Sequence, residues 1–166
     1  SGSDAQTSKL PRGKNVVVNG DFEKVVDGKP ETWKMPECEF VTVERENKNT
    51  FLRFNCPVRA DGKAGFYSVR QEIDLPKGAK IVAVSAKLKT KNDTGNIFPR
   101  AQVGFLNQEE KFFSCAAAWG NGKKGPWQKI HADMDIPKTA IKAFVEVIND
   151  QCPGQIDFDD IEVTFK

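Results

Sequence analysis

Short runs of alternating apolar and polar residues fill most of this chain, and turn-forming residues separate them. In the segment 81–90, for example, Val82, Val84, Ala86 and Leu88 fall on one side of an extended strand. A period of two is typical of a strand with one buried face, and no segment sustains the 3.6-residue period of a helix. The alternating runs are 38–44, 50–56, 66–75, 80–90, 100–105, 111–119, 127–137, 142–150 and 156–165. With a run at residues 15–18, they make about ten short strands and predict an all-β fold, an antiparallel sandwich of two sheets.

Length and charge limit the classes of function that this chain can have. A chain of 166 residues suits one domain. We expect residues 1–14 to be a polar lead-in that begins with an expression scar, and residues 15–166 to form the domain. The 25 basic and 23 acidic side chains leave a net charge of +2, too balanced to indicate binding to nucleic acid or to a membrane surface. No apolar run approaches the roughly 18 residues of a membrane span, so we expect a soluble chain. We also expect it to be a monomer.

The four cysteines allow two interpretations. If residues 38–44 and 50–56 form a hairpin around Asn47, Glu44 faces Thr50 and Cys38 faces Cys56. Directly opposed strand residues lie at Cα separations that a disulfide can use, and a bridge would indicate a secreted or periplasmic protein. Cys115 and Cys152 would form the remaining pair, or all four would be buried free thiols. A zinc site is not indicated, because the chain has no C-x-x-C motif and one histidine.

Both ends of the domain carry acidic residues beside a buried-looking aromatic. Asp21 and Glu23 flank Phe22, and the apolar parity of the last strand switches sides at Asp159 and Asp160. Such a switch predicts a β-bulge. The first and last strands of a sandwich are often neighbours, so Glu23 and Asp159 could meet and offer the oxygen ligands that calcium prefers. The alternative is two solvated turns whose carboxylates never meet.

Three stretches resemble a known family. "NVVVNGDFEK…PETW", "VRQEIDLPKGAKIVAVSAKLKT" and "WQKIHADMDIP…IDFDDIEV" are similar to carbohydrate-binding modules of families four, nine and twenty-two, from about residue 15 to residue 165. The N-G-x-F-E and D-D-[IV] motifs are the most specific pieces. The resemblance implies a jelly-roll β-sandwich that binds a polysaccharide without catalysis. It also implies attachment to other domains of a secreted, periplasmic or cell-surface protein.

The resemblance further implies a structural calcium between the chain ends. Glu23 and Asp159 would be side-chain ligands, with Asp160 beside them. The carbonyl oxygen of Asp21 and carbonyls near Lys48 and Asn49 would complete the site.

Parity supplies a candidate ligand face. Val145 and Val147 look like core residues, so Phe144 and Glu146 should face outward together. The same reasoning turns four more polar side chains outward: Arg70, Glu72, Arg100 and Gln102. An exposed phenylalanine among polar groups could form the floor of a sugar site, and the family has an aromatic and an acid two residues apart on a late strand. The alternative is an ordinary charged sheet face.

Other aromatic residues have different expected places. Trp119 at the start of a glycine-rich loop could clamp a glycan chain or fold back over the core, and Tyr67 is a candidate for the rim. Trp33 and Trp127 match structural positions of the family, so we expect both in the core. The ligand we expect is a plant or algal cell-wall β-glycan.

Two further function classes remain open. One is a calcium-stabilised structural or protein-interaction sandwich that binds no glycan. The other is an enzyme: a lyase that uses Tyr67 and His131, or a glycosidase that uses Glu72 and Glu146 if their strands adjoin. Parity places His131 on the outside, and we expect no catalysis.

Overall fold

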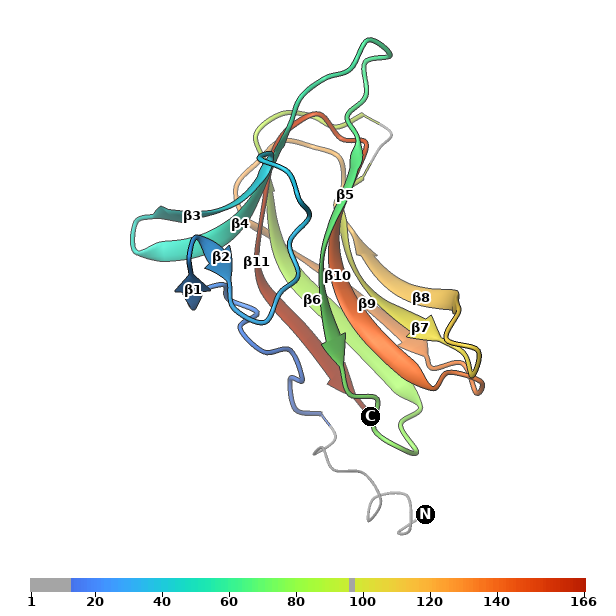
Figure 1. Ribbon diagram of the computed structural model, residues 1–166. Coiled ribbons are helices and arrows are strands. Elements are labelled where there is room, and N and C mark those ends of the chain that lie inside the picture. Colours follow the sequence, from blue (N-terminus) through green and yellow to red (C-terminus); the bar gives the residue numbers. More distant parts are fainter. Residues whose placement is uncertain (1–12, 96–97) are drawn as a thin grey trace.

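The computed structural model describes residues 13–95 and 98–166 (Figure 1). The strands are β1 (Val25–Val26), β2 (Lys29–Pro30), β3 (Val41–Glu46), β4 (Asn49–Cys56), β5 (Phe66–Ile73), β6 (Ile81–Thr90), β7 (Arg100–Leu106), β8 (Phe112–Trp119), β9 (Gln128–Asp135), β10 (Lys142–Asp150) and β11 (Gly154–Phe165). Among the described residues there is no helix that could cross a membrane. Every helix or strand element found in the described residues is a strand, which confirms the all-β prediction.

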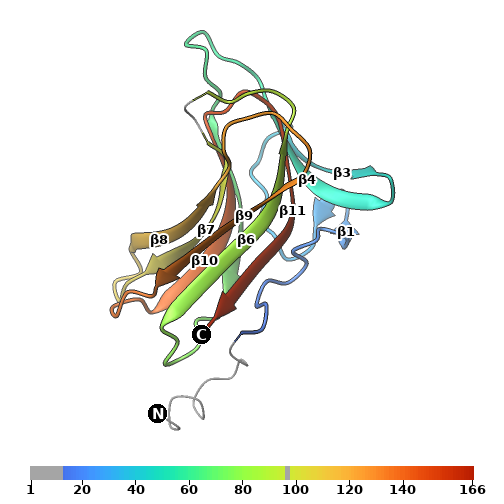
Figure 2. The same cartoon turned by 180° about the vertical axis from the view of Figure 1, so that it is seen from behind.

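The strands form two antiparallel sheets and a small hairpin. One sheet has the order β5-β10-β7-β8, the other has the order β3-β4-β11-β6-β9, and β1 pairs with β2. Figure 1 shows the β3–β4 hairpin projecting to one side of the sandwich, and Figure 2 shows β6, β9 and β11 from behind. Because sequence neighbours such as β10 and β11 belong to different sheets, the chain crosses repeatedly between the two layers.

The alternating residues identified in the sequence form the core between the sheets. Val82, Val84 and Leu88 are fully buried, and the Phe54 and Phe158 rings meet edge to face with centroids 5.8 Å apart. At the other end of the chain Phe22 is also fully buried and lies 5.3 Å from Trp33, centroid to centroid. The prediction for Trp33 is confirmed. Trp127 lies elsewhere: it is half-buried and packs on Phe51, which is not part of the central core cluster.

The first segment runs beside the last strand but is not itself a regular strand. Val16 N–H donates to the Val163 carbonyl at 2.9 Å, and Val163 N–H donates to the Asn15 side chain at 3.0 Å. Ile161 N–H then donates to the Gly20 carbonyl at 2.9 Å. The expected neighbourhood of the chain ends is confirmed, although side-chain bonds replace part of the strand ladder that the three valines predict.

The register predicted for the hairpin is wrong by one residue. Glu44 pairs with Phe51 and Thr50 pairs with Arg45, because the turn contains two residues, Asn47 and Lys48, both with positive φ. Strand β3 begins only at Val41, so Cys38 and Cys56 are not opposed. Within the part of the chain that the structure describes, none of the four cysteines forms a disulfide.

The predicted bulge in the last strand is confirmed. The pairing of β11 with β6 shifts between Asp159 and Glu162, and Asp160 has a φ of 50°. Ile156 and Phe158 before the shift and Ile161 and Val163 after it all reach the core.

Candidate functional site

One side of the sheet β5-β10-β7-β8 faces the core, and the residues between the core positions form what we call the outer face. Cross-strand pairing arranges these residues in rows. One row contains Ser68, Ile148, Arg100 and Trp119; the next contains Arg70, Glu146, Gln102 and Ala117; the third contains Glu72, Phe144, Gly104 and Cys115. The sequence prediction that Phe144, Glu146, Arg100, Gln102, Arg70 and Glu72 share one face is therefore confirmed in register.

A chain of polar contacts crosses the middle of the outer face. Arg100 Nε donates to Gln102 Oε1 at 2.9 Å, and Gln102 Nε2 donates to Glu146 Oε1 at 2.8 Å. Arg100 also forms an ion pair with Asp150 at 3.3 Å. Because Gln102 is buried and bonded at both ends of its amide, it holds Arg100 and Glu146 in fixed positions.

Phe144 does not present a free ring, which corrects the prediction of an exposed sugar-stacking floor. Its side chain is only 3% exposed. The tip of the ring rests on Gly104, where an added Cβ would lie 2.2 Å from a ring atom. Arg70 lies on the ring with its guanidinium carbon 3.6 Å from the centroid, and Phe112 contacts it at 6.1 Å between centroids. Phe144 points outward as its parity predicted, but neighbouring residues cover its ring.

Three exposed rings stand on the outer face: Phe112, 54% exposed, beside Phe144, and two more at opposite edges of the sheet. Trp119 at the end of β8 is 52% exposed, and Phe66 at the start of β5 is 54% exposed. Arg100 lies 4.8 Å from the Trp119 ring centroid. Three strand spacings separate the two edge strands, which are therefore roughly 15 Å apart. The sequence left Trp119 either exposed as a clamp or folded back over the core, and the structure shows it exposed; Phe66 was missed although its parity with Arg70 could have indicated it.

Tyr67 was predicted at the rim and lies elsewhere. It stands on the inner side of β5, in register with Asn149, and its ring meets Phe40 edge to face with centroids 6.0 Å apart. Tyr67 shares the parity of the core residue Val69, which explains why it packs against the core instead of facing a ligand.

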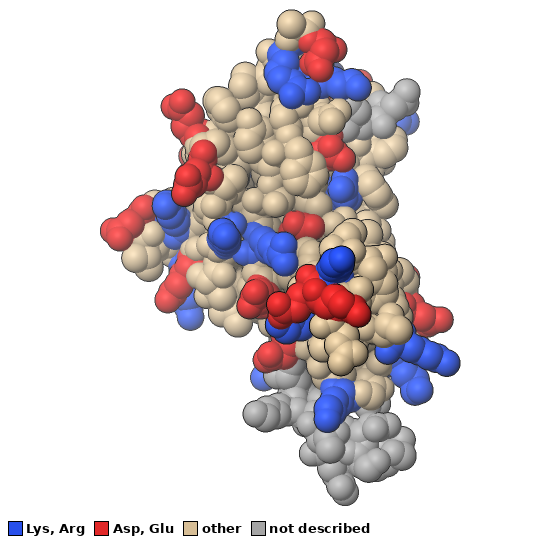
Figure 3. Space-filling view, turned by 45° about the vertical axis from the view of Figure 1, so that its right-hand side comes forward, with Lys and Arg blue, Asp and Glu red and all other residues tan. Residues whose placement is uncertain are grey.

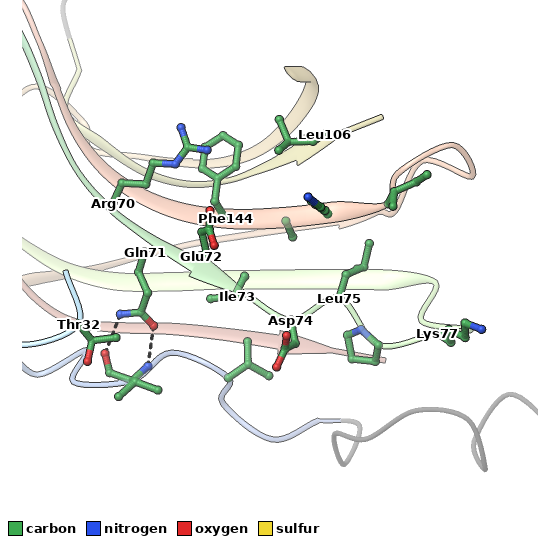
Figure 4. A pocket seen from close by; sticks show the side chains of 16 residues that line it. Thr32, Arg70, Gln71, Glu72, Ile73, Asp74, Leu75, Lys77, Leu106 and Phe144 are labelled. Carbon is green, nitrogen blue, oxygen red and sulfur yellow. Dashed lines mark hydrogen bonds between the residues drawn. The ribbon is translucent and has the colours of Figure 1, made fainter. Parts of the chain in front are cut away.

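A hollow of about 810 Å³ adjoins the outer face at the edge of the sheet that β5 forms, where Lys34 makes an isolated bridge to Arg70 (Figure 4). Arg70, Glu72 and Phe144 line one side of it, and Leu106 and Lys142 extend that side. At the far side, Gln71 bonds both the N–H and the carbonyl of Val18 at 2.8 Å. We call this space the β5 hollow.

Figure 3 shows acidic and basic side chains interleaved over the side of the molecule that it displays.

Three of the six residues predicted around calcium meet beside the turn of the β3–β4 hairpin. Glu23 Oε1 accepts a hydrogen bond from Thr50 N–H at 3.1 Å, and Asn49 bonds the Asp159 carboxyl. Asp159 is 4% exposed, and desolvation raises its pKa to about 6, with the nearby Glu23 charge adding to the shift. A buried carboxyl beside a second carboxylate is costly to ionise unless a cation lies between them, so these oxygens fit a hard cation.

The other three predicted calcium residues are placed differently. The Asp21 carboxylate accepts from the Glu23 N–H at 3.2 Å, and Asp160 forms an ion pair with Lys87 at 2.9 Å. Lys48 lies in the turn beside Asn49 with a φ of 66°. No group of three or more acidic, histidine or cysteine side chains with the geometry of a metal site occurs within residues 13–95 and 98–166. Backbone carbonyls or the Asn49 amide would have to supply further ligands.

Comparisons with known proteins find the fold in solved structures. No protein-family model and no curated protein matches the chain. A family 16 carbohydrate-binding module is 14% identical, with a TM-score of 0.66 over 90% of this chain and 99% of that one. The xylan-binding domain CBM22-1 of Paenibacillus barcinonensis Xyn10C is 12% identical, with a TM-score of 0.64 over 94% of this chain and 97% of that one.

A larger protein contains the same fold. The enzymatically active domain of tailspike protein 4 from bacteriophage CBA120 is 16% identical, with a TM-score of 0.65 over 92% of this chain. This chain spans 21% of that domain. At such identities the likeness establishes the fold: the chain has the jelly-roll β-sandwich of carbohydrate-binding modules, as the sequence motifs implied.

Proposed function

We propose that the chain is a non-catalytic polysaccharide-binding module whose ligand lies across the outer face between Trp119 and Phe66. The observation that carries the proposal is the pair of exposed rings at opposite edges of one sheet. Between them, Arg100, Gln102 and Glu146 form a chain of hydrogen-bonding groups that hold one another in place. Rings can stack on the apolar faces of sugars while fixed polar groups bind the hydroxyls. Structural neighbours named as carbohydrate-binding and xylan-binding modules support this use of the fold.

Affinity electrophoresis on a panel of polysaccharides tests the proposal. Xylan, mixed-linkage glucan, mannan and galactan should be cast separately into native gels. We expect at least one of them to retard the protein and Trp119→Ala to reduce the retardation. Val26→Ala is the matched control, because Val26 is also exposed (57%) but lies in the β1–β2 hairpin. If no polymer retards the parent protein, the calcium-stabilised structural sandwich becomes the better account.

The second candidate function is glycoside hydrolysis, and one observation favours it. Strands β5 and β10 adjoin, with Glu146 opposite Arg70 and Glu72 opposite Phe144. Glu72 and Glu146 are therefore diagonal neighbours, roughly 7–8 Å apart at the backbone, a spacing from which two carboxyl groups can reach the separation of about 6.5–9.5 Å found in inverting glycosidases. Against it, Glu146 is bonded to Gln102. A reducing-sugar assay on the same panel decides: release of sugar that Glu146→Gln abolishes would overturn the non-catalytic proposal.

A bound calcium ion is part of the proposal. Glu23 and Asp159 would hold it through their carboxylates, and Asn49 through its side-chain oxygen. Carbonyls of Asp21 and Lys48 would be the remaining candidates. The ion would neutralise the two facing carboxylates and tie the first segment to β4 and β11. A secreted, periplasmic or cell-surface location and attachment to other domains remain proposals that rest on the fold resemblance.

A further inference from the structure

The Arg70 side chain occupies the place where a sugar would stack. Its guanidinium carbon is 3.6 Å from the Phe144 centroid, a contact distance that requires stacking on the ring. Figure 4 shows the side chain reaching from β5 to the Phe144 ring at the border of the β5 hollow. The tip of the ring rests on Gly104, and the Phe144 side chain as a whole is only 3% exposed. A ligand over this part of the outer face would therefore meet a guanidinium and not a phenyl ring.

Arg70 is also the unpaired cation of the outer face. Strands β5, β10, β7 and β8 carry three cationic side chains, and two of them are engaged: Arg100 with Asp150 and Gln102, and Lys142 with Glu110. Glu146 faces Arg70 in register, but its carboxylate accepts from Gln102. Within residues 13–95 and 98–166 the Arg70 guanidinium has no hydrogen-bond acceptor and no acidic partner. Its planar set of donors is held in place by Phe144 and left without an acceptor.

The β5 hollow gives a ligand group access to this guanidinium. Its volume of about 810 Å³ lies within the range of about 300–1,000 Å³ that small-molecule pockets occupy. The row of Arg70 adjoins the row of Arg100 and Trp119, where we place the glycan main chain. A sugar branching from that chain can therefore enter the hollow past Arg70.

We propose that Arg70 binds the carboxylate of a uronic acid unit, so that the preferred ligand is an acidic polysaccharide. The inference rests on the proposed function and adds the substrate class. A guanidinium pairs with a carboxylate through two parallel hydrogen bonds, and both are strengthened by charge. The Phe144 ring excludes water from one face of the Arg70 guanidinium and fixes the direction in which its N–H donors point. One guanidinium balances one carboxylate, whereas the nearby Glu72 and Glu146 would repel a more highly charged ester.

The test compares polymers that differ only in the carboxylate. Glucuronoxylan and polygalacturonate are each used as prepared and after reduction of their carboxyl groups to alcohols. Binding of the full chain is measured by calorimetry at low and high salt. We expect the acidic form of at least one polymer to bind about tenfold more tightly than its reduced form at low salt, since one charge-assisted contact is at stake. The preference should shrink at high salt.

Substitutions assign the preference to Arg70. Arg70→Gln should bind acidic and reduced forms equally, and Arg70→Lys should retain part of the preference, since charge remains but the paired geometry is lost. Arg45→Ala is the matched control, because Arg45 is an exposed arginine on β3 of the other sheet and should leave the preference unchanged. Thermal melts check that each variant folds.

The outcomes separate the inference from the proposed function. Equal binding of acidic and reduced forms by the parent, weakened in both by Trp119→Ala, would overturn the role of Arg70 and keep the glycan site. A preference that persists in Arg70→Gln would also overturn it. If the parent protein binds no form of either polymer, the role of Arg70 in binding uronic acid is overturned. The panel of neutral glycans then decides whether the glycan site is overturned as well.

Discussion

The Asp159 carboxyl lies buried at the bulge of β11 and faces Glu23, and desolvation raises its pKa from 3.8 to about 6. Because the folded protein then holds this proton more tightly than the unfolded chain, folding favours the protonated form. Without a metal, the free energy of unfolding should therefore fall as the pH rises from about 4 to about 6, and the loss should persist above that range. A cation that binds only the ionised, folded protein would reverse this loss.

The first prediction follows from that single residue. Calcium should raise the melting temperature at neutral pH and have little effect near pH 4, where protons compete for the carboxylates. Asp159→Asn should abolish the calcium effect and flatten the pH dependence measured in chelator. Asp133→Asn is the control, because Asp133 is exposed on β9 and is not among the groups that shift the pKa of Asp159. Coincident melting curves of the parent with calcium and with chelator at neutral pH would contradict the calcium proposal.

At the scale of elements, the clip between the first segment and β11 depends on one glycine. Gly20 accepts a hydrogen bond from Ile161 N–H, and a Cβ at Gly20 would lie 2.2 Å from the Ile161 carbonyl oxygen. That atom belongs to the backbone of a strand paired with β6, so it cannot move aside without disturbing the sheet. The N-G-x-F-E motif thus contains a glycine for steric reasons.

We therefore predict that Gly20→Ala destabilises the protein by about 1–3 kcal/mol through this overlap. Urea denaturation should show a lower midpoint with an unchanged slope. Gly125→Ala provides the comparison, since an added Cβ there has no atom of the described structure within 4 Å. Similar small effects of the two substitutions would show that the first segment is not held tightly against β11.

The same elements show how far sequence reasoning reached. Alternation located β3 to β11 because strands with one buried face must alternate. It did not give the hairpin register, because Asn47 and Lys48 both adopt positive φ in a turn that lacks the usual glycine. It turned Phe144 outward correctly but could not show that Arg70 and Gly104, from neighbouring strands, cover the ring. Burial on an outer face depends on cross-strand neighbours, and a single strand's pattern does not contain them.

At the scale of the whole molecule, the two layers have different roles. The sheet with β11 at its centre contains the last strand and the Asp159 carboxyl that faces Glu23. The sheet with β10 carries the exposed rings and the polar chain of Arg100, Gln102 and Glu146. This division explains why the acidic motifs seen first in the sequence contribute no catalytic group in our account. Ligand binding would depend on residues at opposite edges of one sheet, and antiparallel pairing places these residues on the same face.

Calorimetric titration of a glycan identified on the panel, with the parent and with single-ring variants, tests the central claim most directly. Each stacked ring should contribute about 1 kcal/mol, so Trp119→Ala and Phe66→Ala should each weaken binding roughly fivefold, and Val26→Ala should not. The parent's dissociation constant should lie between about 1 μM and 1 mM. If the parent binds the glycan and neither ring substitution weakens that binding, the ligand does not lie across the outer face and our placement of the site is wrong.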